Sequence, residues 1–435
     1  MNPSLARATK PESHFGVYVH IPYCRRVCPY CDFNVHIAKR AEWRAYGEAV
    51  CTEIAARAES FAGISQVDSL YFGGGTPSLC PPGVLRDIMS AITARWPVAA
   101  GAEITLEVDP KTLDAEGYIA LRGLGVTRVS LGWQSTHDRL LHRLGRGHSA
   151  ADSEQAFSWA RAAGFDDVSV DLIFAVPDET MTDLEGDLER VLALRPEHVS
   201  LYALTFHEGT TFHRWRAAGR LAPVDDELEA AMMTRIEERL VGAGYEHYEV
   251  SNYARPGFRS THNSLYWSGE PYLGVGAGAH SFLREALVRG WRWESVRAPG
   301  AYVAAMRGAT DEALPRTDAG RDAPTRAGAA VGEPTTTRGT ALQPPIATDP
   351  GIAWLEELAA GQLARERFML ALRLGDGLSA RERERLCASG AVERTVVEEA
   401  LREGAARGWL HERAGAVVPT STGLMNADAL AALFF

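Results

Sequence analysis

The chain has 435 residues, of which 46% are hydrophobic and 23% are charged, and its formal net charge is −11. This is the composition of a globular protein long enough for two domains. The acidic balance argues against a large nucleic-acid-binding surface, which needs clustered Lys and Arg. No apolar run reaches the eighteen or so residues of a membrane span.

The N-terminal residues, MNPSLARATKPESHFG, lack the apolar core of a signal peptide. We therefore expect a cytoplasmic protein whose residues 1–14 form a flexible N-terminus. Six cysteines in a chain of this length do not make a disulfide framework.

Short apolar runs alternate with helical patterns from residue 15 to about 205. Strands are predicted at 15–21, 67–74, 103–109, 128–135, 167–176 and 197–205, with helices at 40–60, 82–95, 114–124, 152–163 and 182–194. Near-continuous apolar runs are typical of parallel strands covered on both faces. The alternation indicates repeated βαβ units. We predict an α/β fold with a partial (β/α) barrel over residues 15–250, and a doubly wound open sheet is the alternative.

The rest of the chain divides by composition. A further amphipathic helix is predicted at 225–243, and residues 251–308 form an extension rich in aromatic residues, His and Gly. Residues 309–350 are rich in Ala, Thr, Pro and Gly and contain no aromatic residue, so we expect a disordered insertion. A helical pattern resumes at 351, and a strand-like run at 409–420 suggests a small helical domain of winged-helix type over 351–435.

Polar residues stand at or near the ends of the predicted strands. Cys24 follows the first strand, residues 73–76 end or follow the second, and Glu107, Gln134 and Asp171 lie on the next three. In a parallel barrel the functional groups gather at the C-terminal ends of the strands. Polar groups on apolar strands need partners, which favours a functional site over core packing.

Three cysteines, Cys24, Cys28 and Cys31, lie within eight positions in the pattern C-x3-C-x2-C. A structural zinc site needs four closed ligands, and His20 or His36 could supply the fourth. An iron–sulfur cubane normally takes four cysteines, so three leave one iron open to a ligand that binds and leaves. The remaining cysteines, Cys51, Cys80 and Cys387, are scattered and are expected to be structural.

The cysteine pattern after the first strand resembles the signature of the radical S-adenosylmethionine (radical SAM) superfamily. The glycine motif YFGGGTPS at 71–78 strengthens the resemblance. It implies a [4Fe-4S] cluster on Cys24, Cys28 and Cys31, with S-adenosylmethionine on the fourth iron. The contacts it implies for S-adenosylmethionine are Tyr18, Tyr30, Gly74, Gly75, Thr76, Glu107, Gln134, Arg146 and Asp171.

Further motifs, among them LYFGGGTPS, ITLEVDP, SVDLIFAVPDET and ERFMLALRL, resemble the oxygen-independent coproporphyrinogen III oxidase family. The true oxidases of that family carry a fourth cysteine two residues after the third, where this chain has Phe33, and a longer N-terminal segment. The HemW-type haem chaperone branch reads C-x3-C-x2-C-D-F and carries H-N-x-x-Y-W, which matches HNSLYW at 262–267. In that branch the motif is tied to haem, so the resemblance implies His262 as a haem ligand, and His is the usual proximal ligand of haem iron.

The resemblance therefore implies a protein that binds haem and transfers it to an acceptor, for example a respiratory haemoprotein. An electron donor such as flavodoxin or ferredoxin would reduce the cluster. The alternative is an enzyme that oxidatively decarboxylates coproporphyrinogen III. A radical SAM enzyme that modifies RNA is a third hypothesis, against which the acidic balance counts.

Overall fold

The computed structural model describes residues 14–308 and 349–434. The expected flexible N-terminus (1–14) and the expected insertion (309–350) lie outside these ranges, apart from residues 14, 349 and 350.

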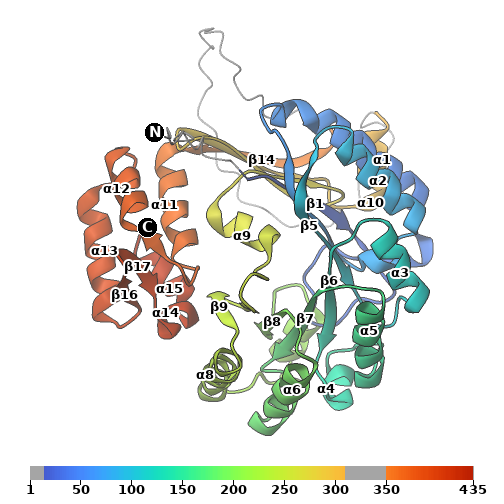
Figure 1. Cartoon of the computed structure of the whole chain (residues 1–435), viewed down its shortest axis with the longest axis horizontal. Helices are drawn as coiled ribbons and strands as arrows, with labels where there is room; N and C mark the ends of the chain where they lie inside the picture. The colour runs from blue at the N-terminus through green and yellow to red at the C-terminus, as the bar shows by residue number, and fades with distance from the viewer. Residues whose placement is uncertain (1–13, 309–348, 435) are drawn as a thin grey trace, which may run out of the picture.

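One twelve-stranded sheet runs through the described part of the molecule, in the order β14-β13-β12-β11-β1-β4-β5-β6-β7-β8-β10-β9 (Figure 1). Its centre is parallel and consists of β11 (Tyr272–Val275), β1 (Gly16–Ile21), β4 (Val67–Gly74), β5 (Val98–Val108), β6 (Arg128–Gln134), β7 (Asp167–Phe174) and β8 (His198–Ala203). The predicted six parallel strands are confirmed. The seventh, β11, was missed because it is only four residues long, between glycine-rich turns.

Antiparallel strands extend the sheet at both edges. They are β12 (His280–Glu285), β13 (Arg289–Ser295) and β14 (Ile352–Ala359) on one side, and β10 (Asn252–Ala254) and β9 (Glu246–Glu249) on the other. The sheet thus crosses the boundary expected at residue 250. β14 corrects the sequence prediction, which has a helical pattern from 351. Pairing with β13 from Arg289 to Ser295 overrides the helical propensity of its Ala, Leu and Glu residues.

Helices cover the convex side of the curved sheet, and Figure 1 shows them as an outer layer. They include α1 (Trp43–Arg57), α2 (Pro82–Thr93), α3 (Ala115–Gly123), α5 (Ala150–Ala162), α6 (Met181–Leu194) and α8 (Asp226–Gly242). α5 and α6 each begin with a capping box, from Ser149 and Thr180. The shorter α4 (Asp138–Arg143), α7 (Thr211–Ala217) and α10 (Pro299–Met306) connect strands, whereas α9 (Thr261–Ser268) lies on the concave side. The partial barrel predicted from the sequence is confirmed.

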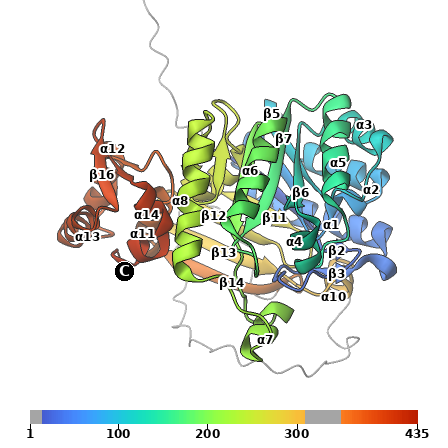
Figure 2. The same cartoon turned by 90° about the horizontal axis from the view of Figure 1, so that it is seen from below.

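The C-terminal residues fold around a core of their own, which includes Phe368, Leu386, Val397 and Leu430. The elements are α11 (Ala360–Ala371), β15 (Leu378–Ser379), α12 (Ala380–Ala388), α13 (Arg394–Ala406), β16 (Leu410–Arg413), β17 (Ala416–Pro419), α14 (Ser421–Met425) and α15 (Ala427–Ala432). From α11 to β17 this is the helix–strand–helix–helix–strand–strand order of a winged helix. Figure 2 shows this unit at one side of the sheet.

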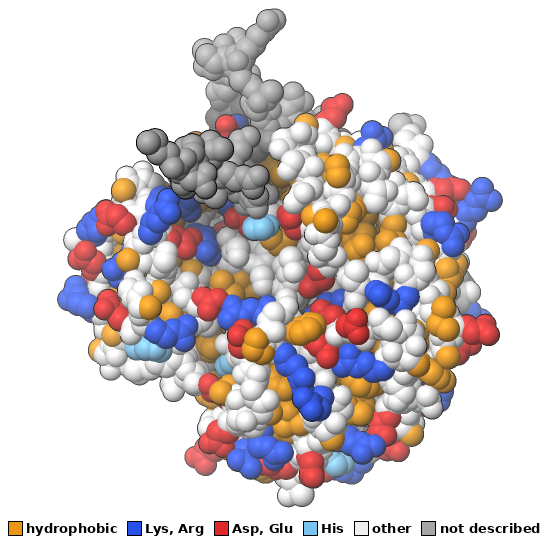
Figure 3. Space-filling view, viewed as in Figure 1, with side chains coloured by type: hydrophobic (Ala, Val, Ile, Leu, Met, Phe, Trp, Pro, Cys, Tyr) orange, Lys and Arg blue, Asp and Glu red, His pale blue; other side chains and the backbone are white. Residues whose placement is uncertain are grey.

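The surface carries charges of both signs. On the face seen in Figure 3, Lys and Arg side chains are interspersed with Asp and Glu. Among the helices described, none is both long and apolar enough to cross a membrane.

Candidate functional site

The three clustered cysteines lie on a loop that is closed at its base. β2 (Tyr23–Cys24) pairs in parallel with β3 (His36–Ile37), and the His36 N–H donates to the Pro22 carbonyl at 2.6 Å. Inside the loop, the Cys31 N–H donates to the Cys28 carbonyl at 3.1 Å. The loop therefore holds Cys24, Cys28 and Cys31 in one short, folded segment at the end of β1.

Polar groups from two other elements reach these sulfurs. The Thr76 hydroxyl donates to Cys24 Sγ at 3.3 Å, and Arg146 Nη1 lies 3.7 Å from Cys28 Sγ. Burial raises the pKa of Cys24, and it raises the pKa of Cys31 to about 12. These two thiols are thus protonated in the free protein, and metal binding must displace their protons.

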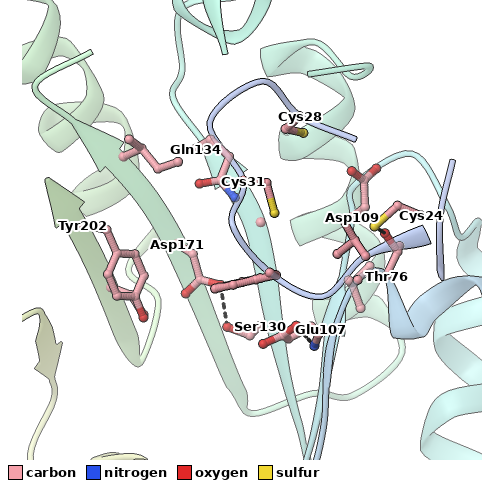
Figure 4. A pocket seen from close by; sticks show the side chains of 18 of the residues that line it. Cys24, Cys28, Cys31, Thr76, Glu107, Asp109, Ser130, Gln134, Asp171 and Tyr202 are labelled. Atoms are coloured by element: carbon pink, nitrogen blue, oxygen red, sulfur yellow. Dashed lines mark hydrogen bonds between the residues drawn. The ribbon is translucent and has the colours of Figure 1, made fainter. Parts of the chain in front are cut away.

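A cavity of about 730 Å³, here called the cluster cavity, opens between this loop and the C-terminal ends of the strands. Figure 4 shows the three thiols on the loop and Glu107, Ser130 and Asp171 on the strands. The predicted S-adenosylmethionine contacts that line it are Tyr30, Gly74, Gly75, Thr76, Glu107, Gln134, Arg146 and Asp171. The structure thus brings together the thiols and every predicted contact except Tyr18.

The two glycines at the end of β4 allow the strand to approach the cysteine loop. Gly74 has a φ of 111°, and a Cβ built on it would lie 2.5 Å from the His20 ring. A Cβ on Gly75 would lie 2.9 Å from the Tyr23 nitrogen and 3.0 Å from Cys24 Sγ. A larger side chain at position 75 would therefore push against Cys24 and against the backbone that precedes it.

Two carboxylates on the strands are held by hydrogen bonds. Glu107 accepts from the Gly74 N–H at 3.0 Å and from the Tyr71 hydroxyl at 2.9 Å, and Asp171 accepts from the Ser130 hydroxyl at 2.7 Å. Burial raises the pKa of Asp171, and it raises the pKa of Glu107 to about 7. Both carboxylates line a water-accessible wall where a cationic ligand group would favour their ionised forms.

Several lining residues were missed by the sequence reasoning. Ser130 pairs in register with Ser169 on the next strand, and Asp171 pairs with Ser200 on the one after. These side chains alternate with buried apolar ones along β6, β7 and β8, so a period of two within the apolar runs was the signal that could have found them. Asp109 also belongs here, because its Oδ2 accepts from Arg146 Nη2 at 2.7 Å.

A second cavity of about 540 Å³, here called the aromatic cavity, adjoins the first. Aromatic side chains from the loop, α9, β11 and β12 line much of it, namely Phe33, Tyr266, Trp267, Tyr272 and Phe282. Asp32, Phe33, Gly74 and Glu107 line both cavities.

Tyr18 lies in the aromatic cavity and does not line the cluster cavity. Side chains alternate along β1, so Tyr18 and His20 share one face, and the Tyr18 hydroxyl lies 3.0 Å from His20 Nδ1. His20 Nε2 lies 2.9 Å from the Asn34 carbonyl. Both ring nitrogens of His20 are thus occupied, which argues against His20 as a fourth zinc ligand.

His262 is buried on α9, with 1% of its surface exposed. Its Nδ1 lies 2.8 Å from the Ser69 hydroxyl, its Nε2 lies 2.8 Å from the Tyr266 hydroxyl, and burial lowers its pKa to about 3. The expectation that His262 ligates haem iron does not agree with this arrangement, because no ring nitrogen is free and the ring lines neither cavity. Its contact with Tyr266 makes it a support for the wall of the aromatic cavity.

The lining of the cluster cavity offers three thiols to a metal group. Over residues 14–308 and 349–434, no three His, Cys, Asp or Glu side chains converge as the ligands of one ion do. Three thiols on one loop, the half-buried guanidinium of Arg146 beside Cys28 and a glycine turn against Cys24 fit a cluster held by three cysteines, with room beside it for a further ligand.

Comparisons of the sequence and the structure with known proteins support the partial-barrel fold described above. The Radical SAM superfamily model matches residues 18–191. "Heme chaperone HemW" of Mycobacterium tuberculosis is 32% identical over 97% of this chain and 95% of its own length, and that of Escherichia coli is 35% identical over 61% of this chain and 69% of its own. That of Synechocystis is 39% identical over 62% of this chain and 66% of its own.

Among solved structures, coproporphyrinogen III oxidase (HemN) from Escherichia coli superposes with a TM-score of 0.75 at 20% identity. The match covers 98% of this chain and 91% of that one, so the two proteins share a fold. The thiols and strand-end residues of this chain meet in one cavity, and the match to the Mycobacterium relative covers nearly the full length of both proteins. The protein therefore belongs to the HemW family of haem chaperones within the radical SAM superfamily.

Proposed function

We propose that the protein binds haem and transfers it to an acceptor protein, and that it carries a [4Fe-4S] cluster on Cys24, Cys28 and Cys31. S-adenosylmethionine would occupy the rest of the cluster cavity, where it would complete the coordination of the fourth iron. The observation that carries the proposal is the pair of adjoining cavities, one lined by the three thiols and the other by aromatic side chains.

Phe33 supports haem transfer over porphyrinogen oxidation. Its ring is 63% exposed and lines both cavities, at the position where the true oxidases resembled by this sequence carry a fourth cysteine. An exposed aromatic ring can pack against a flat macrocycle such as haem. Unlike the cysteine of the oxidases, Phe33 has no thiol that could take part in porphyrinogen oxidation.

The partners follow from the same proposal. They are haem as cargo, an acceptor such as a respiratory haemoprotein, and a flavodoxin or ferredoxin as electron donor. A cytoplasmic location is part of the proposal, because free thiols that hold a cluster require a reducing compartment.

An anaerobic assay separates the two haem-related functions. The full-length protein with its cluster reconstituted is incubated with coproporphyrinogen III, S-adenosylmethionine and dithionite, and a second sample is titrated with haemin. We expect haemin uptake with a Soret band and no protoporphyrinogen. Formation of protoporphyrinogen would instead identify an oxidase, and absence of haemin uptake would remove the basis of the chaperone proposal.

A further inference from the structure

The aromatic cavity contains one histidine whose imidazole is available to a ligand. Of the two histidines that line the cavity, His20 is buried and has both ring nitrogens occupied. His280, at the start of β12, exposes 51% of its side chain, and in the described part of the chain its ring makes no hydrogen bond.

The surroundings of His280 suit a metal-bound imidazole. Glu294 Oε1 lies 3.7 Å from His280 Nε2, so a carboxylate faces one side of the ring. Metal-ligating histidines usually direct their second nitrogen to such a carboxylate, which fixes the ring and raises its basicity. Burial lowers the pKa of His280, which favours the neutral imidazole that iron binds.

The cavity has the shape and wall of a site for a flat apolar ligand. Its volume of about 540 Å³ lies in the range of pockets for small molecules and cofactors. Tyr266 and Tyr272 pack edge to face with their centroids 4.5 Å apart, and Trp267 continues this wall along α9. His262 Nε2 lies 2.8 Å from the Tyr266 hydroxyl, so His262 supports the part of this wall that the HNSLYW segment builds.

Two arginines offer cationic groups at the same cavity. Arg297 is 60% exposed and lies 3.3 Å from Glu294, whereas Arg292 donates to Glu366 at 2.7 Å and lies over the Phe282 ring. Exposed ion pairs are weak, so Arg297 can turn to a carboxylate of a ligand. The cavity is also lined by four acidic side chains, Asp32, Glu107, Glu294 and Glu366. Their negative charges would repel a ligand that carries many negative charges.

We propose that the aromatic cavity binds the haem cargo, with His280 as the axial ligand of the iron and Arg297 as a partner of a propionate. This proposal rests on the proposed function and assigns its binding site. The cargo then lies beside the cluster cavity, separated from it by the residues that the two cavities share, Asp32, Phe33, Gly74 and Glu107.

The test of the iron ligand is a haemin titration of the full-length, cluster-reconstituted protein and its His280→Gly variant. We expect the variant to bind haemin at least about tenfold more weakly, with a shifted Soret band, and added imidazole to restore the wild-type spectrum. A purely structural role for His280 would not allow this rescue. His411→Gly is the matched control, because His411 is an exposed histidine on β16, and the cluster absorbance of each variant reports an intact barrel.

An unchanged affinity and Soret band in His280→Gly would overturn the assignment of His280 while leaving the proposed function in place. If the wild type takes up no haemin, the proposed function fails, and the site assignment fails with it.

The test of the propionate partner compares haemin with haemin dimethyl ester, whose propionates carry no charge. Arg297→Ala should bind haemin several-fold more weakly than the wild type and bind the ester equally well, with the Soret position unchanged. Equal haemin affinity in the two proteins would remove Arg297 from the site.

Discussion

Cys24, Cys28 and Cys31 are the cysteines that line the cluster cavity, so within the described residues no other thiol is placed to replace one of them. We expect Cys28→Ser to lose the reconstituted cluster, because the remaining two thiolates leave two irons without a protein ligand. Iron content and the visible absorbance of the reconstituted protein measure this.

The control is Cys387→Ser, in the C-terminal unit, which should keep the full cluster. Full iron content in Cys28→Ser would show that the cluster is held elsewhere.

Glu107 is expected to make the stability of the metal-free protein depend on pH. Burial raises its pKa in the folded state to about 7, above the ordinary value of about 4.5. The folded state therefore binds more protons between these pH values, and stability falls as pH rises from about 4.5 to about 7. The free energy of unfolding falls by at most about 3 kcal/mol across this window, because a pKa shift of one unit corresponds to about 1.36 kcal/mol. Water in the cavity that Glu107 lines reduces the effect.

Urea unfolding at several pH values tests this, with Glu107→Gln as the variant. We expect a flatter pH dependence in the variant across this window. Identical slopes in the two proteins would mean that Glu107 titrates at an ordinary pKa.

At the residue scale, the sequence motifs predicted the residues that line the cluster cavity, whereas the buried surroundings of His262 could not be foreseen. The thiols and strand-end residues follow one another in the chain at spacings fixed by the barrel, so their meeting could be foreseen. His262 could not be judged from its motif, because its burial depends on Ser69 from β4, 193 residues away. The exposure of His280 likewise depends on how β12 and β13 pair, which no local pattern encodes.

At the scale of elements, a buried carboxylate joins α1 to the turn after β11. Glu53 accepts from the Gly276 N–H at 2.8 Å and from the Ser295 and Tyr302 hydroxyls at 2.7 Å each. Glu53→Ala would leave these three buried donors without their acceptor and would remove the carboxylate that lies 4.0 Å from Arg57 Nε, while Arg57 would keep its ion pair with Asp349. We expect the free energy of unfolding to drop by about 3–5 kcal/mol, as measured by urea denaturation.

Glu48→Ala is the matched control on the same helix. Glu48 is exposed and pairs with Arg44 one turn away, so its loss should leave stability almost unchanged. Equal effects of the two substitutions would show that Glu53 does not anchor the turn.

Helices and strands could be predicted from the sequence where their apolar residues form a regular pattern. The six strands and their helices agree with the sequence prediction, since each parallel strand reads as a continuous apolar run. β14 was not predicted because it is an edge strand in which all residues but Leu358 are exposed or half-exposed, and its pairing with β13 makes it a strand.

At the scale of the whole molecule, the C-terminal unit packs against the helix that carries the HNSLYW segment. Arg367 Nη1 on α11 donates to the Trp267 carbonyl at 3.0 Å, and Arg373 lies over the Trp267 ring. The arrangement of the two folded units could not be read from the sequence, because these contacts join residues about a hundred positions apart.

In the proposed function, one chain holds a cluster and haem in two adjoining cavities at the same time. The most direct measurement is quantification of haem and of non-haem iron in one sample, after haemin is added anaerobically to the cluster-reconstituted protein. We expect one haem per chain with the four cluster irons retained, and a Cys28→Ser protein that still takes up haem. Loss of cluster iron in step with haem uptake would contradict it, because cluster and haem would then compete for the same site.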